Sequence, residues 1–184
     1  MESLENNEWF ALRVRSNCEK AVAASLNGRG YEEFLPLYRK LSRRPGPAKQ
    51  IELPLFPGYV FGSFDVNRRL PVLTIPGVVH VVGIGRVPEP IDREEMLAIE
   101  RFVKSGLAVE PWPFLKTGEG VLVDRGPLAG LEGILVQIKS SHRLVVSLSL
   151  LQRSVAVEID RVCVRPLAPA TVRGGAFHAS KRVA

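Results

Sequence analysis

Residues 118–136 read GEGVLVDRGPLAGLEGILV, two apolar runs separated by a segment rich in turn-forming residues. The glycines Gly126, Gly130 and Gly133 punctuate these runs around Pro127. Glycine is required where φ is positive or where two backbones approach closely, as at the corner of a small barrel. The segment therefore predicts two short strands joined by a tight loop, with Leu128 exposed at the loop tip.

The chain continues with more β-branched, turn-separated segments. They read GILVQI at 133–138, RLVVSLSL at 143–150, SVAVEI at 154–159 and VCVRPL at 162–167. Several short strands at near-regular spacing are typical of a small barrel. Residues 168–184 mix Gly, Arg, Lys and Ala with little to bury, so we expect a disordered basic tail.

The first half of the chain mixes strand and helix patterns. WFALRVR at 9–15 alternates as a half-buried strand does, and Ser16 with Glu19 has the spacing of a helix capping box. Asp92 and Glu95 repeat that spacing before a run of helical period, and the basic segment RRPGPAK at 43–49 separates two apolar stretches as a hairpin tip would. Residues 9–105 therefore predict an α+β layout, with helices packed on an antiparallel sheet.

Residues 107–116, LAVEPWPFLK, carry two prolines and no periodicity, which is the composition of a linker. We place the domain boundary there. Upstream, PLFPGYVF at 54–61 puts Pro57 and Gly58 at the centre of a type II turn that brings Phe56 and Tyr59 together. The alternative is that both aromatic side chains are simply core.

Composition limits the classes of function. The chain has 184 residues, 46% of them hydrophobic and 24% charged, and a formal charge of +6, which favours nucleic acid or an acidic protein surface as a partner. Neither a membrane span nor a signal peptide is evident, so we expect a cytoplasmic protein. Cys18 and Cys163 are far apart in sequence and form no metal-ligand spacing, so we expect two ordinary thiols.

The motifs together resemble one family. WFALRVRSNCEK, EEFLPLYRK, PLFPGYVF and IPGVVHVVG, in that order, resemble the NGN domain of the NusG family. The segment 118–136, followed by RLVVSLSLLQRSVAVEID, resembles its KOW domain. The resemblance implies an NGN domain at 8–106, a linker at 107–116 and an SH3-like KOW β-barrel at 117–167.

The function that this resemblance implies is transcription elongation or antitermination by a monomer without cofactors. The NGN domain would bind the clamp helices of the largest RNA polymerase subunit, and the KOW domain would recruit Rho or a small-subunit ribosomal protein. The implied clamp-helix contacts are Phe56, Tyr59, Phe61, Met96, Ile99 and Phe102. The implied contacts to non-template DNA or to the opposite polymerase pincer are Arg15, Asn17, Lys20, Arg68 and Arg69. The implied KOW partner contacts are Gly126, Pro127, Leu128 and Leu151.

Two departures from the family pattern concern the KOW domain. Housekeeping members usually read GPF in the loop and IFG in a later strand, whereas this chain has Leu128 after Gly126 and Pro127, and Leu150, Leu151 and Gln152 at the second place. The loss of aromatic anchors disfavours Rho and favours a specialised paralogue, similar to RfaH or the polysaccharide-operon antiterminators. The strong strand preference of VVSLSL and SVAVEI disfavours refolding of the barrel into helices.

Two other classes compete with this interpretation. An enzyme is disfavoured because the chain has no phosphate-binding loop, nucleophile elbow or H-E-x-x-H motif, and its three histidines are scattered. The alternative is a ribosome-associated or RNA-binding KOW protein, which shares the barrel but does not need the PLFPGYVF segment.

Overall fold

The computed structural model describes residues 8–41, 49–115 and 118–167. The N-terminal half is built on a four-stranded antiparallel sheet in the order β2-β5-β1-β6. Its strands are β1 (Trp9–Val14), β2 (Glu32–Phe34), β5 (Tyr59–Ser63) and β6 (Val78–Val81). The α+β class predicted from the mixed patterns is confirmed. The predicted disordered tail, 168–184, lies outside the described residues.

Helix α1 (Glu19–Gly28) begins close to the predicted place but without the predicted capping box. Cys18 occupies the N-cap position and makes no side-chain cap hydrogen bond, so the expected role of Ser16 is wrong. The Glu19 carboxylate instead accepts a hydrogen bond from the Gly58 N–H at 2.8 Å. The capping-box spacing identified the helix start but not the partner, because a buried N–H elsewhere in the fold takes the carboxylate. The short helices η1 (Val66–Arg68) and α2 (Leu70–Leu73) follow β5.

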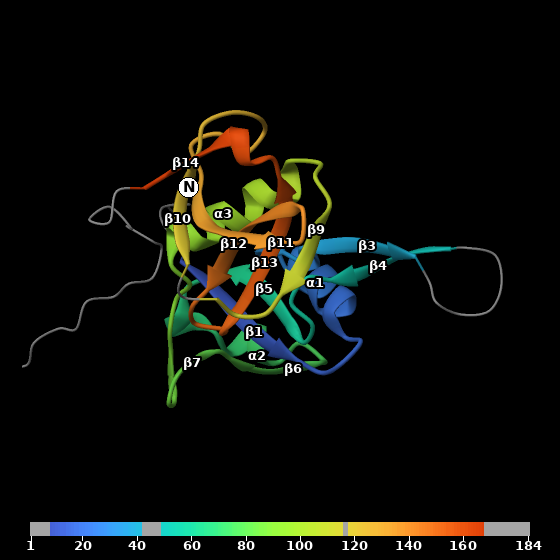
Figure 1. Ribbon diagram of the computed structural model, residues 1–184. Helices are drawn as coiled ribbons and strands as arrows, with labels where there is room; N and C mark the ends of the chain where they lie inside the picture. The colour runs from blue at the N-terminus through green and yellow to red at the C-terminus, as the bar shows by residue number, and fades with distance from the viewer. Residues whose placement is uncertain (1–7, 42–48, 116–117, 168–184) are drawn as a thin grey trace, which may run out of the picture.

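Two hairpins project from this sheet. β3 (Leu37–Leu41) pairs with β4 (Gln50–Pro54), and this hairpin extends away from the body of the molecule (Figure 1). β7 (Gly83–Ile84) pairs with β8 (Val87–Pro88). The predicted hairpin is confirmed, while its basic tip lies mostly in 42–48, outside the described residues.

Helix α3 (Arg93–Lys104) follows the predicted start signal. The Asp92 carboxylate accepts hydrogen bonds from the N–H groups of Glu94 at 2.9 Å and Glu95 at 3.1 Å. Met96, Ile99 and Phe102 recur at helical spacing and are all buried. One face of α3 is therefore largely apolar and packs against a partner surface.

The C-terminal half forms a six-stranded antiparallel sheet in the order β14-β10-β11-β12-β13-β9, as the predicted small barrel requires. Its strands are β9 (Val109–Trp112), β10 (Glu119–Val123), β11 (Glu132–Ile138), β12 (Ser141–Leu148), β13 (Arg153–Ile159) and β14 (Val164–Pro166), with η2 (Arg161–Cys163) before the last. Gly133 lies where β11 and β12 meet closely. A Cβ there would stand 2.9 Å from the Val145 carbonyl oxygen, so only glycine fits without displacement.

The segment expected to be a linker is partly a strand. Within 107–116, β9 pairs antiparallel with β13, with Val109 opposite Val157 and Trp112 opposite Ser154. Just beyond β9, the Leu115 N–H donates to Ser154 Oγ at 3.2 Å, and Ser147 Oγ donates to the Leu115 carbonyl at 2.9 Å. The prolines did not prevent pairing because β9 lies at the edge of the sheet, where a missing N–H costs little.

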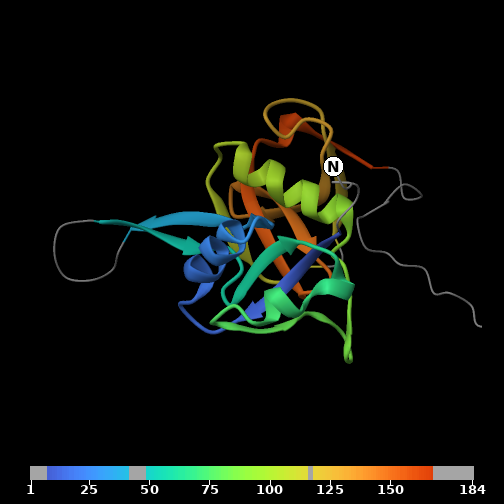
Figure 2. The same cartoon turned by 180° about the vertical axis from the view of Figure 1, so that it is seen from behind.

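The buried side chains form two clusters. One lies between α1, α2 and the N-terminal sheet and includes Phe10, Leu26 and Phe64. The other joins the two halves of the chain, because it contains residues of α3 and β5 together with residues of β10 to β14. In Figure 2, α3 runs across the barrel strands, above the N-terminal sheet. In the described part of the chain, no helix is long and apolar enough to cross a membrane.

Candidate partner-binding surfaces

The turn at 56–59 is held in place from two sides. Its Gly58 has a φ of 81°, and the Tyr59 N–H donates to the Phe56 carbonyl at 3.1 Å, as the predicted type II turn requires. Glu19 accepts from the Gly58 N–H, and the guanidinium carbon of Arg13 lies 4.9 Å from the centroid of the Tyr59 ring. The turn is therefore held by contacts from α1 and β1.

The six residues implied for clamp-helix binding belong to one apolar cluster. Phe56, Phe61, Met96, Ile99 and Phe102 are at most 1% exposed, and Tyr59 is half-buried against them. The rings of Phe56 and Phe61 are perpendicular, with centroids 5.5 Å apart. The structure thus brings the turn and the α3 face together in one buried apolar cluster.

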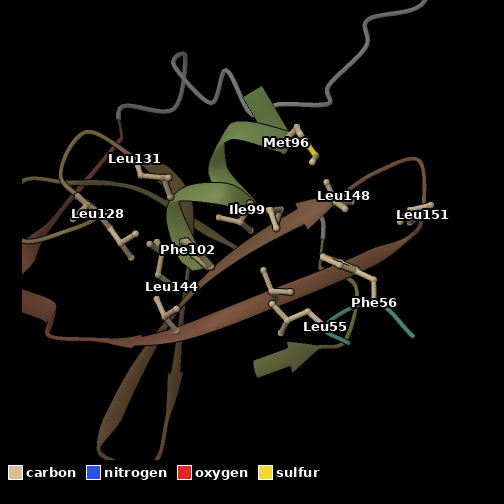
Figure 3. Close-up of a cluster of buried hydrophobic side chains, with 14 of the residues drawn as sticks. Leu55, Phe56, Met96, Ile99, Phe102, Leu128, Leu131, Leu144, Leu148 and Leu151 are labelled. Atoms are coloured by element: carbon tan, nitrogen blue, oxygen red, sulfur yellow. The ribbon is translucent and has the colours of Figure 1, made fainter. Parts of the chain in front are cut away.

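The barrel covers this surface. Leu144 and Leu148 of β12 lie in the same cluster as Ile99 and Phe102, and Figure 3 shows these α3 side chains directed toward β12. Leu151, in the turn after β12, is 7% exposed. The face expected to bind the polymerase is therefore buried against the chain's own second half.

Leu128 was expected at an exposed loop tip, and this expectation is wrong. Its side chain is 1% exposed, and it lies in the cluster that contains Phe102 and Leu131 (Figure 3). The loop turns Leu128 inward, while Gly126 and Pro127 stay exposed. Leu128 and Leu151 are therefore buried in the same cluster as the α3 residues expected to bind polymerase.

Two hydrogen bonds cross between α3 and the barrel. The Ser149 N–H donates to Glu95 Oε2 at 3.0 Å, and the Arg101 guanidinium donates to the Ala129 carbonyl. Glu95 is 3% exposed, and its Oε1 has no hydrogen-bond partner among the described residues. Burial raises the pKa of Glu95 to about 7, and the charge of Asp92 adds to this, whereas the Ser149 contacts oppose it.

The polar residues implied for contact with DNA or with the opposite polymerase pincer form two separate groups. Arg15 and Asn17, in the β1–α1 turn, and Lys20, at the start of α1, are all exposed. Asn17 has a φ of 64°, and Lys20 Nζ lies 3.9 Å from a carboxylate oxygen of Glu52. The first group is thus a solvent-facing polar patch beside the 56–59 turn, to which α1 is bonded through Glu19.

The second basic group lies at η1 and the start of α2. Arg68 is exposed and 3.9 Å from the Asp65 carboxylate, while Arg69 bonds the Val66 carbonyl at 3.0 Å and is half-buried. Arg68 is therefore accessible to a partner despite its exposed ion pair, whereas Arg69 is engaged in its own turn.

The sequence patterns did not mark Glu95 or the leucines of β12 as part of a candidate site. A signal for Glu95 existed, because it precedes Ile99 and Phe102 by four and seven residues and so shares their helix face. A carboxylate within an apolar helix stripe indicates a special environment. No comparable signal marked Leu144 or Leu148, whose alternation fits a barrel core equally well.

Comparison with known proteins identifies the family. The family model described as transcription termination factor nusG matches residues 7–100. The transcription termination/antitermination protein NusG of Pseudomonas aeruginosa is 30% identical over 166 residues, covering 83% of this chain and 94% of the relative. The chain belongs to the NusG family. The NusG protein of Vibrio vulnificus is 29% identical, covering 87% of this chain and 96% of the relative.

A solved structure shares the fold. The chain superposes with a TM-score of 0.54 on a structure that concerns domain interaction in Thermotoga maritima NusG. Sequence identity to it is 21%, and the match covers 88% of this chain and 97% of that one. Both halves of this NusG-family chain therefore lie within the match.

Proposed function

We propose that this chain is a NusG-type transcription elongation and antitermination factor that binds RNA polymerase through residues 8–106. Family membership supports the general role. The observation that carries the docking proposal is the continuous apolar face of Phe56, Phe61, Met96, Ile99 and Phe102, which Tyr59 borders. This apolar face is suited to a helical partner such as the polymerase clamp helices. Burial of such a face gives roughly 25 cal/mol per Å² before ordering costs are subtracted.

The described arrangement is a closed one, so binding requires the barrel to leave α3. Ile99 and Phe102 are fully buried in the cluster that the barrel completes and cannot contact a second protein at the same time. We infer that the polymerase binds an open form. The apparent affinity for polymerase is then the affinity of the open form multiplied by the fraction of molecules that are open. The closed form thus regulates a function that the N-terminal half supplies.

The barrel, residues 117–167, is proposed to recruit a second partner through Gly126, Pro127, Leu128 and Leu151. Leu128 and Leu151 are available only after opening, because both are buried in the closed arrangement. Leucine offers less contact area than an aromatic anchor and a larger ordering cost. A small-subunit ribosomal protein therefore fits this surface better than Rho, and a specialised paralogue fits better than a housekeeping factor.

Arg15, Asn17, Lys20 and Arg68 are proposed to contact non-template DNA or the opposite polymerase pincer. Their exposure supports this role, since phosphate attraction needs accessible charge but no base readout. Arg69 is proposed to contribute by positioning Arg68, because its guanidinium is bonded to the Val66 carbonyl. We propose a monomer of the cytoplasm with no catalytic activity and no cofactor.

The test is copurification with core RNA polymerase, followed by single-round elongation with and without Rho. Ile99→Glu places a charge on the docking face and should abolish polymerase capture. The matched control is Leu97→Glu, at a residue of α3 that is 48% exposed, and it should leave polymerase capture unchanged. Capture of ribosomal particles alone, without polymerase, would replace this proposal by the RNA-binding KOW alternative.

A further inference from the structure

The contact between Glu95 and Ser149 differs from the rest of the closed interface because it buries a charge-bearing group. The buried side chains of the cluster that joins the two halves are otherwise apolar. Glu95 reaches it from the first turn of α3, and its Oε2 accepts from the Ser149 N–H at 3.0 Å. That N–H belongs to the β12–β13 turn, so the bond joins the two halves of the chain.

A buried carboxylate with one unpartnered oxygen is poorly compensated. Oε1 of Glu95 has no hydrogen-bond partner in the part of the chain that the structure describes, although the residue is only 3% exposed. An ionised carboxylate accepts several hydrogen bonds in water, and losing them on burial is costly. A protonated carboxyl loses much less hydration free energy on burial than an ionised one does. Separation of the barrel from α3 returns Glu95 to an exposed helix surface, where the ionised form is stable.

Among the residues that the structure describes, none forms an ion pair with Glu95 that would compensate its charge. On its own element, Asp92 is negative and disfavours ionisation of Glu95. On the barrel side, Ser149 contributes its N–H and hydroxyl, and Gln152 is engaged with the Ser149 carbonyl at 2.7 Å. Arg153, at the start of β13, is exposed and forms no ion pair with Glu95 within the described ranges. The balance of burial and charge therefore penalises the ionised form only while the interface is closed.

We propose that Glu95 is a proton-sensitive latch: its neutral form holds the barrel on α3, and its ionised form favours release. The sign follows from linkage, because the group binds its proton more tightly in the closed form than in the open one. Closure is therefore strengthened as pH falls through the neutral range and weakened as it rises. The consequence for polymerase rests on the proposed function, but closure itself is a property of the free chain.

The size of the effect follows from the two pKa values. A pKa of about 7 in the closed form, against the ordinary 4.5 in the open form, makes the closed-to-open ratio about tenfold smaller at pH 8 than at pH 6. Most of the change occurs below pH 7, because above it both forms are ionised.

The experiment measures closure on the full chain without polymerase. Amide hydrogen exchange by NMR gives protection factors for Ser149 and for the barrel residues that face α3, corrected for intrinsic exchange. We expect protection to fall about tenfold from pH 6 to pH 8 in the wild type. Glu95→Gln, which keeps an acceptor for the Ser149 N–H without a titrating charge, should keep its protection at both pH values. Glu94→Gln, an exposed neighbour with the same charge change, should behave as the wild type does.

A second measurement keeps the test decisive if Glu95→Gln folds poorly. The side-chain carboxyl carbon of Glu95 in the wild type should titrate near pH 7 by carbon NMR. Titration in the ordinary glutamate range, or interface protection that is the same at pH 6 and pH 8, overturns the latch. Such a result leaves the proposed function standing, because polymerase capture by the α3 face is measured separately.

Discussion

Leu151→Asp should convert the closed molecule into one that binds polymerase more tightly. Leu151 is 7% exposed, so nearly its whole side chain is removed from water in the closed form. Losing that burial costs about 2 kcal/mol, which corresponds to about a thirtyfold shift toward the open form. The aspartate adds a further desolvation penalty to closure, so this figure is a lower estimate. Under the proposal that only the open form binds polymerase, the apparent affinity should rise by the same factor until the open form predominates.

The assay is fluorescence-monitored titration of core RNA polymerase with labelled protein at constant salt. The matched control is Val162→Asp, which places the same charge on the same barrel at a residue that is 70% exposed. That variant should bind as the wild type does. Amide NMR signals of β12 and β13 establish that the barrel is folded in both variants. A folded Leu151→Asp protein whose affinity equals that of the wild type would refute the idea that closure competes with polymerase.

Three further outcomes are expected. Tyr59→Ala, introduced into the Leu151→Asp chain so that closure does not mask the effect, should weaken polymerase binding by roughly 1–3 kcal/mol; an unchanged dissociation constant would leave Tyr59 a purely structural role. In termination assays with added Rho, the wild type should reduce pausing without stimulating Rho, and clear stimulation would favour an ordinary housekeeping factor. Arg143→Ala removes ion pairs to Glu110 at 3.3 Å and Glu158 at 2.6 Å, and should lower the free energy of unfolding by less than about 1 kcal/mol. The loss should shrink at high salt in urea titrations, whereas a salt-independent loss would indicate a packing role.

The parts of the fold that the sequence predicts well are those set by local chemistry. Gly58 takes the positive φ that its place after Pro57 in a type II turn requires. Asp92 caps α3 through its own side chain, because the acceptor and the free N–H groups lie within one turn. The alternating segments of the second half become strands for the same reason, since period-2 burial is a property of each segment.

The parts that the sequence misses depend on contacts between distant segments. Glu19 and Glu95 both have capping-box spacing, yet each carboxylate bonds an N–H far along the chain, at Gly58 and Ser149. Leu128 is buried rather than exposed because α3 shares its apolar cluster, a fact of tertiary packing that the loop sequence does not contain. The strand character of β9 likewise depends on the free edge of β13.

One interface covers both proposed partner surfaces, and this couples them. Phe102 and Ile99 of the N-terminal half and Leu128 and Leu151 of the barrel are buried by the same closure. A partner that binds either surface selects the open form and so exposes the other surface at no additional cost. Linkage then requires the effect to be reciprocal, with each partner raising the affinity for the other by at most the closed-to-open ratio. Under the proposed function, recruitment by the barrel is therefore favoured on molecules already bound to polymerase, without any direct contact between the two partners.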